Sequence, residues 1–112
     1  MKKLIKLIKE FVDERDWNQF HSPKNLAMSI NIEAAELSEI FQWRTEKESY
    51  DLDEVKRSEL EHEIADVLIY SLELADKFDI DVTEAIKKKI EINKHKYPVD
   101  KCKRSSRKYT EI

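Results

Sequence analysis

Four carboxylates form two pairs that share one helical spacing. Glu33 and Glu36 are three residues apart, and so are Glu63 and Asp66, with 26 residues between the pairs. Residues three apart lie on one side of an α-helix, about one turn from each other. If the two helices pack antiparallel, the pairs face each other across the seam. A site with only oxygen ligands selects a hard cation, Mg²⁺ or Mn²⁺, rather than zinc.

The sequence around these acids favours a functional role over a solvated one. Asp66 is followed at once by the apolar residues 67–69, and Glu33 is preceded by Ile30 and Ile32. Carboxylates embedded in apolar helix segments cost free energy unless a positive charge compensates them. Two such pairs therefore predict a shared divalent cation.

The same acids allow two other interpretations, a solvated helix face and a di-iron site. A single Glu-x-x-Glu in a helix is usually a solvated feature. Di-iron bundles use two Glu-x-x-His motifs, and Glu59 with His62 shows that spacing once. Glu39, three residues after Glu36, is either a helper in the site or a solvated side chain.

The composition predicts a single all-α domain spanning residues 1–112. The chain has no glycine, two prolines and 40% charged residues, so turn-forming residues are rare. Its one cysteine, Cys102, excludes an internal disulfide and fits a reducing compartment. Lysines interrupt the apolar residues at the N-terminus, which argues against a signal peptide or a membrane span. We therefore expect a cytoplasmic protein.

Four helices with short connections are expected to form a bundle-like fold. Apolar periodicity and start signals at Ser22-Pro23, Asp53 and Asp81 predict these helices at residues 2–16, 23–43, 54–78 and 82–96. The polar, basic tail at 98–112 is expected to be extended. The second half of the third helix is apolar almost all round, which predicts a central, buried helix. Ile69 and Leu72 fall away from its main core line, which favours a homo-oligomer.

Several segments together resemble one protein family. The acidic motif Glu33-x-x-Glu36 followed by Glu63-x-x-Asp66 is similar to the signature of the MazG-like, all-α nucleoside triphosphate pyrophosphohydrolases. Further segments resemble the dCTP pyrophosphatase branch of that family, over about residues 11–111: Arg15-Asp16-Trp17, Phe20-His21, Pro23, Asn25-Leu26, Phe41-Gln42-Trp43, Asp66–Tyr70, Ile92-Asn93, Lys96-Tyr97-Pro98 and Ser105–Glu111. Residues 44–58 show no firm match.

The resemblance implies an activity and a set of ligands. The family hydrolyses a nucleoside triphosphate to the monophosphate and pyrophosphate with Mg²⁺. By this resemblance Glu33, Glu36, Glu63 and Asp66 are the metal ligands and the catalytic acids. Glu36 is our choice for the group that orients or deprotonates the attacking water.

Aromatic and polar residues are candidates for base recognition. In the branch that the chain resembles, an aromatic cluster encloses the cytosine ring, which implicates Trp17, His21, Trp43 and Tyr70. Trp43 is expected two turns beyond Glu36 on the same helical face. Core packing explains Trp43 and Tyr70 equally well, a loop anchor explains Trp17, and a turn histidine explains His21. Asn93 is either a base or sugar contact or a buried polar group.

The charge distribution suits a cation and a polyanion bound together. Residues 33–66 hold twelve acids against four Lys or Arg, whereas residues 87–108 hold ten Lys or Arg against two acids. Lys96, Arg107 and Lys108 are candidates for phosphate binding, together with Arg104, Ser105 and Ser106. A solvated tail or a nucleic-acid patch is the alternative, but the net charge of −3 argues against nucleic acid.

The sequence therefore predicts a Mg²⁺-dependent dCTP pyrophosphatase that also accepts modified dCTP and cleanses the nucleotide pool. The same chemistry on dUTP or another non-standard triphosphate is the alternative within this class. A non-catalytic helical interaction module is the alternative outside it, and the presence of all four acids disfavours it. The resembled family forms dimers and tetramers, so we expect a homotetramer ahead of a dimer.

Overall fold

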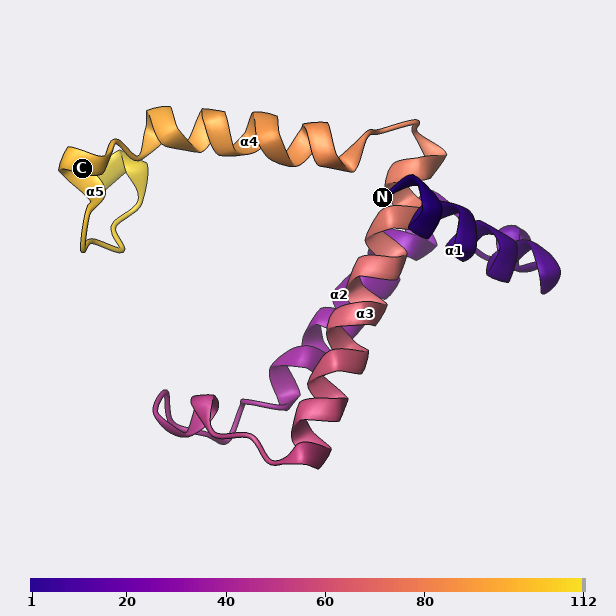
Figure 1. The fold of residues 1–112 in the computed structure, drawn as a ribbon, viewed down its shortest axis with the longest axis horizontal. Helices are drawn as coiled ribbons and strands as arrows, with labels where there is room; N and C mark the ends of the chain where they lie inside the picture. Colours follow the sequence, from indigo (N-terminus) through magenta and orange to yellow (C-terminus); the bar gives the residue numbers. More distant parts are fainter. Residues whose placement is uncertain (112) are drawn as a thin grey trace. The chain divides into compact units, whose positions relative to one another are not determined.

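The computed structural model describes residues 1–111, apart from the side chain of Tyr109, and these residues form helices, short 3₁₀ turns and loops (Figure 1). This confirms the all-α prediction. None of the helices in this range is both long and apolar enough to cross a bilayer. The elements in chain order are α1 (Lys2–Glu14), η1 (Trp17–Gln19), α2 (Pro23–Glu39), η2 (Glu48–Tyr50), α3 (Glu54–Lys77), α4 (Val82–Lys96), α5 (Val99–Cys102) and η3 (Tyr109–Glu111).

The chain consists of two compact units, Met1–Asp79 and Ile80–Ile112. The first unit contains α1, α2 and α3, and the second contains α4 and α5. Each unit is described by itself below. The prediction that the four long helices form one bundle-like domain stays a prediction.

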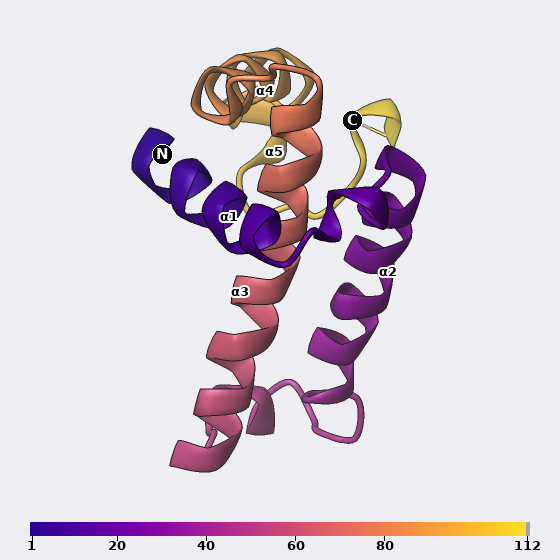
Figure 2. The same ribbon diagram turned by 90° about the vertical axis from the view of Figure 1, so that its right-hand side faces the viewer.

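Helices α2 and α3 run antiparallel along each other, and α1 packs against α3 (Figure 2). The buried apolar side chains of the described chain are Ile8 and Val12 on α1, Leu26 on α2 and Leu72 on α3. The expectation that Leu72 falls away from the core is wrong, because α1 crosses α3 in this part of the first unit and covers it. The antiparallel pairing of α2 and α3 is the arrangement that the acidic site requires.

Three helices begin at the predicted capping residues. The side chains of Ser22, Asp53 and Asp81 each accept a hydrogen bond from the backbone N–H three residues on, at 3.1, 2.8 and 3.1 Å. Each bond satisfies one of the N–H groups that a helix start leaves without an intrahelical partner. These caps fix the first residues of α2, α3 and α4 within the sequence.

Helix α2 ends at Glu39, four residues earlier than predicted. The N–H groups of Ile40 and Phe41 donate to the carbonyls three residues back, at 3.3 and 3.0 Å, so the chain tightens into turns. Trp43 lies beyond this change and does not continue the helical face of Glu36. The predicted loop at 44–52 contains η2, which opens with reciprocal 3.1 Å bonds between Thr45 and Glu48.

The turns that follow α1 and α3 use aspartate in a chain that has no glycine. Asp16 and Asp79 adopt left-handed conformations, with φ of 53° and 54°. After Asp16 the chain enters η1, and the amide of Asn25 donates to the carbonyl of Phe20 at 2.9 Å. These contacts hold residues 17–21 against the start of α2.

Much apolar surface stays exposed on this chain. On α3 the exposed fractions are 42% for Ile64, 54% for Leu68 and 36% for Ile69, because α1 and α2 cover only one side of it. The prediction that this part of α3 is buried all round is therefore wrong within one chain. The tail is also not fully extended, because it contains α5 and η3.

The small buried core leads to a prediction about the stability of the fold. Replacing Leu26, which is 1% exposed, by alanine is expected to lower the free energy of unfolding by about 2–5 kcal/mol, because the side chain leaves a cavity. Urea denaturation followed by circular dichroism measures the loss. The matched control is Met28→Ala on the same helix, at a site that is 54% exposed. An equal loss at Met28 contradicts this ranking and indicates that another copy of the chain covers α2.

Candidate metal and nucleotide site

The acidic residues meet at the seam between α2 and α3. Glu33 and Glu36 on α2 and Glu63 on α3 each place a carboxylate oxygen within 4.8 Å of the others. The structure therefore brings together three of the four predicted ligands. Asp66 lies one turn further along α3 and outside this group, and its ligand role stays a prediction.

Two oxygens in this cluster are buried without a hydrogen-bond partner in the described chain. They are Oε2 of Glu33 and Oε2 of Glu63, one from each helix. A buried polar atom left without a partner costs about 1–3 kcal/mol, and a charged one more. Three converging carboxylates with unsatisfied oxygens fit a hard divalent cation, because such a cation takes oxygen ligands and offsets their repulsion.

The protonation of the cluster reflects the same crowding. Burial first, and then the neighbouring carboxyl groups of Glu36, Glu63 and Asp66, raises the pKa of Glu33 to about 7. Burial first, and then the charge of Glu36, also raises the pKa of Glu63. Protons therefore do part of the work that a bound cation would do.

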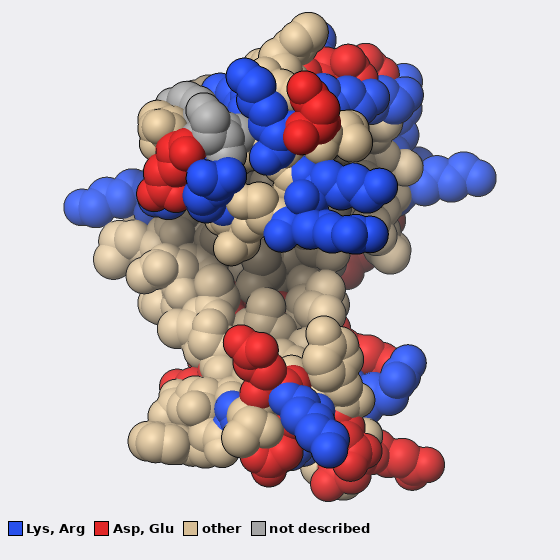
Figure 3. Space-filling model, turned by 90° about the vertical axis from the view of Figure 1, so that its left-hand side faces the viewer, with Lys and Arg blue, Asp and Glu red and all other residues tan. Residues whose placement is uncertain are grey.

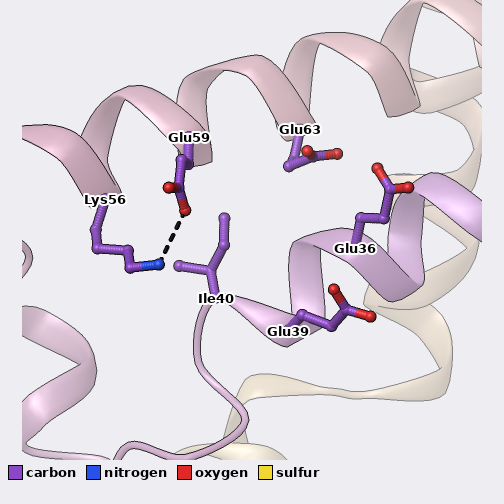
Figure 4. Close-up of a pocket in the computed structure, with 6 residues that line it drawn as sticks. All are labelled: Glu36, Glu39, Ile40, Lys56, Glu59 and Glu63. Atoms are coloured by element: carbon purple, nitrogen blue, oxygen red, sulfur yellow. Dashed lines mark hydrogen bonds and ion pairs between the residues drawn. The ribbon is translucent and has the colours of Figure 1, made fainter.

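A cavity of about 350 Å³ opens beside the cluster. In Figure 4 the carboxylates of Glu36 and Glu63 lie across from each other at one end of it. At the other end Lys56 donates to Glu59 at 3.1 Å. Glu39 also lines the cavity, so this acid lies at the site, while its role stays open.

Three aromatic rings form a continuous series of contacts that ends at Tyr70 on α3. The ring centroids of Trp17 and His21 are 6.0 Å apart, and those of His21 and Tyr70 are 6.1 Å apart. Burial first, and then the negative charges of Glu33, Asp66, Glu73 and Glu36, raises the pKa of the Tyr70 hydroxyl. The structure therefore brings three predicted base-binding residues together in one aromatic series, and its Tyr70 member lies on α3 with Glu63 and Asp66.

Glu73 contacts this aromatic series and was not predicted from the sequence. Nδ1 of His21 lies 2.6 Å from Oε2 of Glu73 on α3. The side chain of Glu73 is only 8% exposed. Glu73 is seven residues after Asp66, two turns along the same face of α3, and that spacing was the available signal.

The other predicted residues are not brought to the acids by the described structure. Trp43 is 89% exposed in the loop after α2. Asn93 and Lys96 are half-buried on α4, and Arg107 and Lys108 are exposed in the tail, all in the second unit. Figure 3 shows that Lys and Arg side chains gather over this unit. Binding roles for these residues stay predictions.

The sequence of this chain matches one known protein family. The model of the MazG-like family matches residues 28–112, which covers both acidic pairs. The chain belongs to the MazG-like family. The match also includes Trp43, Tyr70 and the basic tail.

Similar proteins are dCTP pyrophosphatases and a solved pyrophosphatase. This MazG-like chain is 43% identical to human dCTP pyrophosphatase 1 and 39% identical to the mouse protein, each over 105 residues. These matches cover 92% of this chain and 62% of each relative, so the chain spans about three fifths of their length. A crystal structure of a pyrophosphatase from Archaeoglobus fulgidus superposes with a TM-score of 0.82 at 52% identity, covering 88% of this chain and 92% of that one.

The raised pKa of Glu33 predicts how the metal-free protein responds to pH. Its folded value of about 7 lies above the ordinary 4.5, so the folded state binds this proton more tightly. Its contribution to stability is therefore present at low pH and is lost as the pH rises from about 4.5 to about 7. Thermal unfolding is measured in a chelator at about pH 5 and about pH 8. From the lower to the higher pH, the melting temperature of Glu33→Gln should fall less than that of the wild type. Equal decreases contradict the assignment.

Proposed function

We propose that this chain hydrolyses dCTP to dCMP and pyrophosphate with Mg²⁺, and that it also accepts modified dCTP. The observation that carries the proposal is the pair of buried, unpartnered oxygens of Glu33 and Glu63 in a three-carboxylate cluster beside a cavity. The names of the relatives support the choice of dCTP within the MazG-like family. Cleansing of the nucleotide pool in the cytoplasm is the role that this activity would serve.

The reaction breaks the bond between the α-phosphorus and the oxygen that bridges to the β-phosphate. Water attacks the α-phosphorus, its oxygen stays on dCMP, and the bridging oxygen leaves with pyrophosphate. Glu33, Glu36, Glu63 and Asp66 would hold Mg²⁺, with Mn²⁺ as an alternative. When bound, such an ion neutralises charge on the phosphates.

Glu36 is the residue to which we assign the attacking water. Its side chain is exposed and lines the cavity, whereas Glu33 and Glu63 are half-buried. An exposed carboxylate at the mouth of the cluster can accept a hydrogen bond from water, orient it and take its proton. The proton then passes to solvent, which closes the balance of the hydrolysis.

The cytosine base would stack on the aromatic series. Trp17 and Tyr70 both contact the ring of His21, and Tyr70 lies on the same helix as Glu63 and Asp66, so a base held there would direct its triphosphate toward the carboxylates. Trp43, which is exposed on this chain, is free to close over the ring, and Asn93 would contact the base or sugar.

The sequence of the second unit is rich in the positive charge that a triphosphate needs. Lys96, Arg107 and Lys108 would bind the phosphates, with Arg104, Ser105 and Ser106 beside them. The exposed apolar faces of α1 and α3 would be covered in a homotetramer, or failing that a dimer. Neither nucleic acid nor a membrane is needed by this proposal.

A panel of triphosphates tests the function. Pyrophosphate release is measured with Mg²⁺ for the common deoxynucleoside triphosphates, dUTP and 5-methyl-dCTP. We expect dCTP and 5-methyl-dCTP to be hydrolysed with the highest kcat/KM. No release from any of them contradicts the enzyme activity, and equal release from all contradicts the cytosine pocket.

Removal of one carboxylate tests the metal site. Glu63→Gln is expected to lower kcat at least about a hundredfold, because a ligand that faces the phosphates loses its charge. The matched control is Glu61→Gln on the same helix, where the side chain is 71% exposed and pairs with Arg57 at 3.9 Å. Circular dichroism checks that both variants keep their helices. Wild-type activity in Glu63→Gln refutes the ligand assignment.

A further inference from the structure

A buried carboxylate fixes the imidazole of His21. Nδ1 of His21 and Oε2 of Glu73 are 2.6 Å apart, and their side chains are only 17% and 8% exposed. The two residues are 52 positions apart in the sequence, so this contact ties the turn before α2 to α3. An ion pair on the surface contributes little, but a short bond at this depth orients the ring.

The bond also selects which nitrogen of the ring carries the proton. An ionised carboxylate accepts hydrogen bonds and cannot donate them. Nδ1 of His21 must therefore be the donor, and in the neutral ring Nε2 keeps its lone pair and is an acceptor. Glu73 thus determines the hydrogen-bonding character of Nε2 through the other nitrogen of the ring.

Nε2 is available to a ligand. Among the side chains that the structure describes, none is a hydrogen-bond partner of this atom. The unpartnered polar atoms that are fully buried in this part of the chain belong to Glu33 and Glu63, so Nε2 keeps contact with solvent. The ring also lies between Trp17 and Tyr70, the flat surfaces on which a base would stack.

We propose that Glu73 is a specificity-determining positioning residue, which makes Nε2 of His21 an acceptor for the exocyclic amine of cytosine. This inference rests on the proposed dCTP pyrophosphatase function. Cytosine presents an amine donor at C4, whereas uracil and thymine present a carbonyl acceptor at that position. The Nε2 acceptor forms a hydrogen bond with the amine of cytosine and repels the carbonyl oxygen of uracil or thymine. The wrong base also leaves a buried polar group without a partner, which costs binding free energy.

The test compares kcat/KM for dCTP and dUTP in the wild type and in Glu73→Gln. A glutamine amide can donate as well as accept, so the tautomer is no longer imposed on His21. We expect the preference for dCTP over dUTP to fall about tenfold, the effect of one lost hydrogen bond. The matched control is Asp76→Asn on the same helix, where the carboxylate pairs with Lys9 at 3.3 Å, and it should keep the wild-type ratio.

A second measurement reads the tautomer directly. The ¹⁵N shifts of the His21 ring, assigned by their absence in His21→Gln, should show a protonated Nδ1 and an unprotonated Nε2 in the wild type. The same shifts should change in Glu73→Gln. A protonated Nε2 in the wild type, or an unchanged dCTP to dUTP ratio in Glu73→Gln, overturns the inference.

The two proposals fail in different ways. A wild type that hydrolyses no triphosphate overturns the proposed function, and the specificity role of Glu73 with it, whatever the tautomer. A wild type that prefers dCTP while Glu73→Gln keeps that preference overturns the role of Glu73 alone. Loss of all activity in Glu73→Gln with intact circular dichroism and an unchanged tautomer assigns Glu73 to general packing and also overturns it.

Discussion

Charge repulsion between carboxylates at the seam of α2 and α3 is the constraint on which the rest of the first unit depends. Two of the oxygens there, on Glu33 and Glu63, are buried and have no partner among residues 1–111. Packing the two helices more tightly would bury more charge, and separating them would expose the small core. A divalent cation would resolve the conflict, and the raised pKa of Glu33 relieves part of it when no cation is bound.

The first unit has few buried apolar side chains to position the site. Leu26 and Leu72, together with Ile8 and Val12, are its buried apolar side chains, while large apolar side chains of α1 and α3 stay exposed. The homo-oligomer that we propose would cover these side chains and would add to the stability of the chain. Polar caps and the contact of His21 with Glu73 also help to position the elements of the site.

Local sequence signals were enough to predict the helix starts and the acidic pairs. Helix starts at Ser22, Asp53 and Asp81 depend on one side chain and one nearby N–H group, and the acidic pairs depend on the helical repeat. The early end of α2, the burial of Leu72 and the pairing of His21 with Glu73 were not predicted. They depend on turn geometry or on contacts between distant segments, which periodicity does not contain.

The central claim is that Glu33, Glu36 and Glu63 hold a divalent cation at the α2–α3 seam. The most direct measurement is a crystal structure of the protein with Mn²⁺ and a non-hydrolysable dCTP analogue, with anomalous data collected at the manganese edge. We predict an anomalous peak within bonding distance of these three carboxylates, at about 2.0–2.4 Å from their oxygens. Manganese bound elsewhere, with the carboxylates free of it, would contradict the account.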